Sequence, residues 1–88
     1  MMRVGIVDDH PVVRDGLAGA LAREPGVSVE WTSGSLAEGR AALAAGDCDV
    51  VLVDVRLPDG SGLDLVAPPG PGVPAFLVLS SFPVQMTM

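Results

Sequence analysis

The sequence of 88 residues contains no lysine and only one cysteine, Cys48. Five arginines stand against eleven acidic residues, so the net charge is −6 and a basic nucleic-acid-binding surface is not expected. One cysteine cannot form an intrachain disulfide, which favours a cytoplasmic protein with Cys48 as a small buried hydrophobe. No apolar run approaches the roughly 20 residues of a membrane-spanning helix, and no signal-peptide pattern precedes the first acidic residues.

Aromatic residues are also scarce, at 3% of the sequence, whereas the hydrophobic fraction is 49%. This composition predicts an aliphatic α/β core and argues against disorder. A chain of this length has room for one domain, so we expect residues 1–88 to form a single unit.

Four short apolar runs predict four β-strands. The run at 50–53, Val-Val-Leu-Val, is aliphatic throughout, which is typical of a strand buried on both faces of a parallel sheet. Apolar and polar residues alternate over 27–32, which predicts an edge strand with one wetter face. The four expected strands cover residues 3–7, 27–32, 49–55 and 75–79.

Helices are expected between these strands. Pro11 suits the first turn of one helix, and Ser35 with Glu38 forms a capping box for a second. The Pro/Gly-rich segment 68–74 cuts a third helix short, because proline lacks the backbone donor. Strands that alternate with helices imply a parallel sheet, whose ligands gather at the carboxyl ends of the strands. The apolar face of the first helix is expected at Val13, Leu17, Ala20 and Leu21.

Acidic residues collect where the expected strands end. Asp8 and Asp9 follow the first strand, and Asp54 lies at the tip of the third. If these strands are neighbours, the three carboxylates converge, and they repel one another unless a cation intervenes. Mg²⁺ binds through one or two carboxylates and leaves room for phosphate oxygens. The pattern therefore predicts Asp54 as a nucleophile, Asp8 and Asp9 as metal ligands, and Ser80 as a donor to a phosphoryl oxygen.

Three segments together resemble the receiver domain of response regulators. They occur in the family's order and approximate spacing across residues 3–82, and the His-Pro after the acid pair is similar to the subfamily with a helix-turn-helix DNA-binding output domain. The resemblance implies a flavodoxin-like α/β fold, a doubly wound parallel sheet with strand order 2-1-3-4. The segments are Val4-Gly-Ile-Val-Asp-Asp-His-Pro-Val-Val-Arg-Asp-Gly-Leu, Asp49-Val-Val-Leu-Val-Asp-Val-Arg-Leu-Pro-Asp-Gly-Ser-Gly-Leu and Val78-Leu-Ser-Ser-Phe.

The resemblance also implies a function. Asp54 would accept a phosphoryl group from a sensor histidine kinase, in a two-component phosphorelay that regulates transcription through an output domain absent from residues 1–88. Asp8 or Asp9, Asp54 and the backbone carbonyl of Arg56 would coordinate Mg²⁺, and Ser80 would be the switch hydroxyl. The family's fifth strand supplies a lysine that pairs with the phosphoryl group. This sequence has no lysine and too few residues for that strand and the last helices, so we expect an incomplete receiver.

Other interpretations remain open. Ser80 is equally a strand-end serine satisfied by the backbone, and His10 is expected as a solvated or capping residue. The alternative function is a pseudo-receiver without phosphotransfer, which serves as an interaction module or forms a homodimer through the exposed edge of the fourth strand. A small phosphatase or phosphotransferase ranks last, because no general acid is recognisable. We expect a signalling module rather than an enzyme, with no contact to nucleic acid or membrane.

Overall fold

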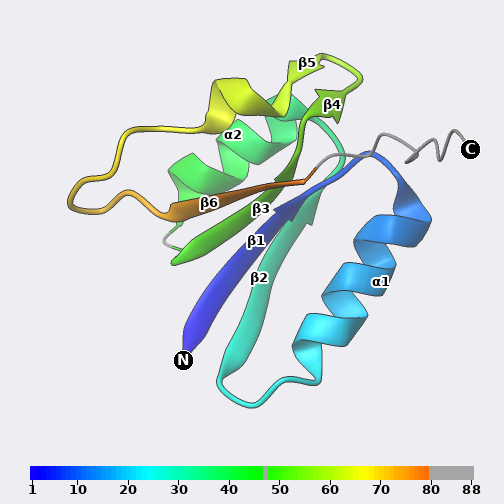
Figure 1. The fold of residues 1–88 in the computed structure, drawn as a ribbon, viewed down its shortest axis with the longest axis vertical. Helices are drawn as coiled ribbons and strands as arrows, with labels where there is room; N and C mark the ends of the chain where they lie inside the picture. The colour runs from blue at the N-terminus through cyan, green and yellow to red at the C-terminus, as the bar shows by residue number, and fades with distance from the viewer. Residues whose placement is uncertain (47, 80–88) are drawn as a thin grey trace, which may run out of the picture.

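The computed structural model describes residues 1–46 and 48–79 (Figure 1). Four strands form a parallel sheet in the order β2-β1-β3-β6, which confirms the expected order with β6 as its fourth strand. No helix in the described part of the chain is long and apolar enough to cross a membrane. In chain order, the elements are β1 (Met2–Val7), α1 (Pro11–Ala22), β2 (Val27–Ser33), α2 (Leu36–Ala45), β3 (Val50–Asp54), β4 (Arg56–Leu57), β5 (Gly60–Ser61), the 3-10 helix η1 (Gly62–Leu65) and β6 (Ala75–Leu79).

The main core lies between one face of the sheet and α2 with η1. Val7 of β1 and Val51 and Val53 of β3 are fully buried there, on the same face because side chains alternate along a strand. Cys48 joins this core, which confirms its expected role as a small buried hydrophobe. The buried members of the core are Val7, Leu36, Cys48, Val51, Val53, Leu57 and Leu65.

Helix α1 packs beside β2, across the sheet from α2 (Figure 1). None of its twelve residues is buried. Leu17 and Leu21 are half-buried as expected, but Val13 and Ala20 are exposed, so the predicted apolar face is wrong at these two positions. The helix contacts mainly the edge strand, and a narrow contact at a sheet edge covers less of a helix than a full face would.

The turn cluster after β3 forms a small antiparallel hairpin, β4–β5, which we did not expect. Asp59 at its tip accepts hydrogen bonds from the N–H groups of Leu36 and Ala37 at 2.7 and 2.9 Å. The bond from Ala37 contributes most and the bond from Leu36 comes next in holding the pKa of Asp59 below its usual value. A helix N-terminus favours negative charge in this way. Ser35 provides the expected cap by accepting the N–H of Glu38 at 3.1 Å. The hairpin is thereby tied to the first turn of α2.

After the hairpin, the chain passes so close to β3 that only glycine fits at residue 62. A Cβ at Gly62 would overlap the carbonyl oxygen of Asp54 and come within 2.8 Å of Cγ2 of Val53. The Gly62 N–H donates to the carbonyl oxygen of Val55 at 2.8 Å, which fixes this close approach. The backbone of Gly62 therefore packs directly against the carbonyl group of Asp54.

Gly62→Ala should destabilise the fold by about 1–3 kcal/mol, because the added methyl group must displace backbone. Gly19→Ala is the matched control: a Cβ at Gly19, on the outside of α1, meets no described atom within 4 Å. Alanine in a helix is favoured over glycine by up to about 1 kcal/mol, so this control should stabilise the protein. Urea unfolding followed by circular dichroism measures both free energies. Equal stability of Gly62→Ala and the unchanged protein would contradict the close approach.

Candidate functional site

Three carboxylates meet at the carboxyl edge of the sheet, where β1 and β3 end. The two strands pair in parallel with Val7 opposite Val53, so the residues that follow, Asp8 and Asp54, stand side by side. Asp8 is 3% exposed and Asp54 is 1% exposed, whereas Asp9 is half-buried. We call Asp8, Asp9 and Asp54 the acidic cluster.

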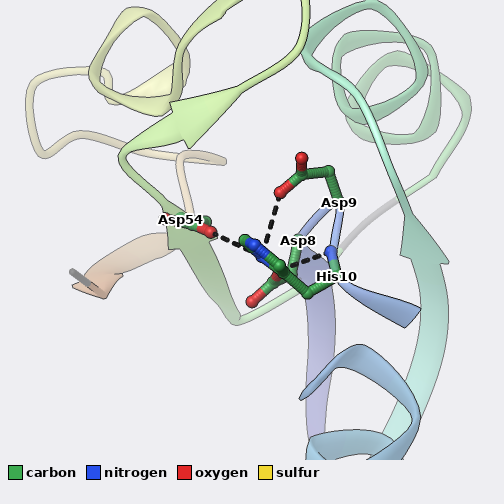
Figure 2. A group of neighbouring side chains, drawn as sticks. All are labelled: Asp8, Asp9, His10 and Asp54. Atoms are coloured by element: carbon green, nitrogen blue, oxygen red, sulfur yellow. Dashed lines mark hydrogen bonds and ion pairs between the residues drawn. The ribbon is translucent and has the colours of Figure 1, made fainter. Parts of the chain in front are cut away.

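His10 points into the acidic cluster, as Figure 2 shows. Its Nδ1 lies 3.0 Å from Oδ1 of Asp8, 3.1 Å from Oδ1 of Asp9 and 3.6 Å from Oδ2 of Asp54. The ring hydrogen-bonds Asp8, whereas its contacts with Asp9 and Asp54 are ion-pair distances without a hydrogen bond. One possible ligand atom from each of the four residues lies within 4.8 Å of the others. His10 lies at the N-cap position of α1 and is half-exposed, in line with the expected solvated or capping residue, but its contacts with the acids were not expected.

The acidic cluster raises the pKa of His10. The hydrogen bond to Asp8 contributes most and the negative charge of Asp9 comes next, because both favour the protonated ring. In return, the imidazolium offsets part of the repulsion among the acids. That repulsion is large: two like charges about 4 Å apart repel by about 4 kcal/mol at an effective dielectric constant of about 20.

Backbone contacts hold the acidic side of the site in place. The N–H of Asp8 donates to the carbonyl oxygen of Ser33 on β2 at 3.0 Å. Oδ1 of Asp8 accepts a hydrogen bond from the N–H of His10 at 2.8 Å. The backbone carbonyl oxygen of Asp8 accepts a hydrogen bond from Nη1 of Arg14 at 3.4 Å. Asp8 is therefore anchored to β2 and to the first turns of α1.

Two buried oxygens of the acidic cluster have no hydrogen bond to any described residue. Oδ1 of Asp54 accepts the N–H of Arg56 at 3.2 Å. Within the described residues, Oδ2 of Asp54 and Oδ1 of Asp9 are buried and have no hydrogen-bond partner. A buried carboxylate oxygen without a partner is costly unless a cation or proton meets it. Because Mg²⁺ prefers carboxylate and carbonyl oxygens, the residues present fit this ion.

The expected roles of two further residues, Arg56 and Ser80, stay predictions. Arg56 begins β4, two residues beyond Asp54, and the metal contact of its carbonyl oxygen stays a prediction. Ser80, the expected switch hydroxyl, lies outside the described residues.

Residues 4–68, which include the acidic cluster and His10, match the response regulator receiver domain. The chain belongs to this family. It is 48% identical over 65 residues to the DNA-binding transcriptional activator DevR/DosR of Mycobacterium tuberculosis. It is 39% identical over 80 residues to the transcriptional regulatory protein UhpA of Salmonella typhimurium. The matches cover 74% and 91% of this chain, but the chain spans only 30% and 40% of these two relatives.

A solved structure confirms the receiver fold. The MaeR response regulator bound to beryllium trifluoride superposes with a TM-score of 0.78, over 94% of this chain and 70% of that chain. Sequence identity is 22%, so this likeness concerns the fold alone. The flavodoxin-like α/β architecture expected from the sequence is therefore correct.

The contacts of His10 predict a measurable titration. His10 is the only histidine, so its ring signals can be followed by NMR without ambiguity. We expect a midpoint above the usual value of about 6.5, and a lower midpoint in Asp9→Asn, which lacks the neighbouring charge. Glu24→Gln, an exposed acid at the opposite end of the sheet, should leave the midpoint unchanged.

The raised pKa of His10 also determines how the stability of the fold changes with pH. Because the folded pKa of His10 lies above its unfolded value, the protonated ring stabilises the fold fully below a pH of about 6.5. This contribution is lost as the pH rises through the folded pKa. A midpoint at or below 6.5 in the unchanged protein would mean that the ring does not contact the acids in solution.

Proposed function

We propose that this chain is the phosphoacceptor receiver of a two-component phosphorelay and that Asp54 takes a phosphoryl group from a sensor histidine kinase. The observation that carries the proposal is the Oδ2 atom of Asp54, which is buried, has no hydrogen-bond partner among the described residues and lies within the acidic cluster, directed at the His10 ring. Membership of the receiver family supports a signalling role. Under this proposal the chain is a signalling module and not an enzyme.

Asp54 supplies the nucleophile. One of its carboxylate oxygens bonds to phosphorus as the bond from phosphorus to the donor nitrogen breaks, and the product is an aspartyl phosphate. The Arg56 N–H and the close approach of Gly62 hold the Asp54 carboxylate and backbone in a fixed position. A carboxylate fixed in this way loses little freedom on reaching in-line geometry.

Asp8, Asp9 and Asp54, with the carbonyl oxygen of Arg56, would hold Mg²⁺. When bound, this ion supplies positive charge that neutralises the transferred phosphoryl group. Residues 1–88 contain no lysine, so positive charge at the site would come from the metal and, in part, from His10. Ser80 would donate its hydroxyl hydrogen to a phosphoryl oxygen.

We further propose that the receiver regulates transcription through an output domain outside residues 1–88. The support comes from the relatives, a DNA-binding transcriptional activator and a transcriptional regulatory protein, each longer than the matched part. Such a regulator meets its kinase and its DNA in the cytoplasm, which is where we place the protein.

A second candidate function is that of an interaction or dimerisation module without phosphotransfer. Strand β6 is an edge of the sheet in the described residues, and its Leu77 and Val78 are 55% and 39% exposed. An exposed apolar edge strand favours pairing with another chain. Sedimentation that finds only a compact monomer would exclude a homodimer through this edge.

Incubation with Mg²⁺ and acetyl phosphate should add one phosphoryl group to Asp54, measured by intact mass and peptide mapping. Asp54→Asn should remain unlabelled, and Glu24→Gln should be labelled as fast as the unchanged protein. Omission of Mg²⁺, or Asp9→Asn, should slow labelling at least about tenfold, the scale on which metal affinity responds to altered ligand contacts. An unchanged protein that folds, binds Mg²⁺ and yet stays unlabelled would overturn the proposal and favour the second candidate.

A further inference from the structure

One side chain brings a nitrogen donor to the acidic cluster. From this arrangement we infer that His10 is a metal ligand and that Asp8, Asp9, His10 and Asp54 together bind a first-row transition cation such as Ni²⁺ or Co²⁺. The inference rests on the proposed function insofar as both use the acidic cluster. It adds a nitrogen ligand, which strengthens the preference of the site for transition cations over Mg²⁺.

The local backbone directs His10 toward the acids. His10 is the N-cap residue of α1 with extended backbone (φ −90°, ψ 107°), and its side chain makes no capping hydrogen bond to the helix. Its N–H is held by Oδ1 of Asp8 at 2.8 Å. The side chain is 53% exposed, so one side of the ring faces the acids while another faces solvent, from which a cation arrives.

A hydrogen bond from the ring cannot satisfy the whole acidic cluster. Nδ1 carries at most one proton, and Asp8 already takes that hydrogen bond. Oδ2 of Asp54 lies 3.6 Å from the same nitrogen, on a residue 1% exposed, with no hydrogen-bond partner among the described residues. Figure 2 shows this oxygen directed at the ring. A divalent cation can meet several of these atoms at once, whereas a single proton cannot.

The donor set selects the metal. Mg²⁺ is a hard ion that prefers oxygen ligands, so an imidazole nitrogen contributes little to its binding. Imidazole suits transition cations, and the affinity of a mixed nitrogen and oxygen site rises from Mn²⁺ through Co²⁺ and Ni²⁺ to Cu²⁺. The ligand atoms already lie within 4.8 Å of one another, so the site needs only local adjustment of side chains to close around such an ion. His10 should therefore separate the affinity for Ni²⁺ from the affinity for Mg²⁺.

Calorimetric titration of the untagged protein with Ni²⁺ and with Mg²⁺ tests this inference. We expect Ni²⁺ to bind more tightly than Mg²⁺, and His10→Ala to weaken Ni²⁺ binding at least about tenfold without weakening Mg²⁺ binding. Asp54→Asn should weaken both, and Glu24→Gln neither. A second readout is NMR with Co²⁺: the ring protons of the only histidine should show large paramagnetic shifts, and Asp54→Asn should reduce them.

The outcomes separate the inference from the proposed function. If Mg²⁺ binds and His10→Ala leaves Ni²⁺ affinity unchanged, the ligand role is overturned while the phosphoacceptor proposal stands. If His10→Ala strengthens binding of both ions, His10 obstructs the site, and the ligand role is again overturned. If the folded, unchanged protein binds neither ion, both the inference and the metal-assisted phosphoacceptor are wrong.

Discussion

The parallel pairing of β1 with β3 is the constraint on which the site depends. It sets Val7 opposite Val53, and each strand continues directly from a fully buried valine into an acid. The same register therefore builds the hydrophobic core and forces Asp8 and Asp54 together. A one-residue slip of either strand would separate the acids, but it would also move the valines of that strand out of the core. Burial of these valines on the α2 face therefore holds the register and offsets the electrostatic cost at the carboxyl edge.

Much of this arrangement could be predicted from the sequence. The aliphatic run before Asp54 identified a central strand, and the alternation over 27–32 identified an edge strand; both positions are correct. Once the strand order is known, the convergence of Asp8 and Asp54 follows from the geometry of parallel sheets. The prediction worked here because strand periodicity and burial depend on short stretches of sequence, and such patterns are visible in a single chain.

What could not be predicted depends on contacts between distant segments. The β4–β5 hairpin has strands of two residues, too short for any periodicity, and Asp59 finds its partners on a helix more than twenty residues earlier in the chain. The proximity of the His10 ring to Asp54, at 3.6 Å, depends on the pairing of β1 with β3, since three other elements separate the two residues in the sequence. Val13 is exposed on α1, which contacts mainly β2, and spacing along a helix does not reveal which strand the helix packs against.

These unpredicted contacts explain how the site is kept rigid around a repulsive centre. The segment after Asp54 is fixed at successive points: the Arg56 N–H bonds to the carboxylate, Leu57 is buried in the core, and Asp59 bonds to the first turn of α2. On the other side, Asp8 is held by the backbone of β2 and α1. With both sides anchored, the acids cannot relieve their repulsion by moving apart, so a positive group has to come to them. His10 meets that need in part, and its single hydrogen bond leaves the oxygen of Asp54 to attract a cation of higher charge.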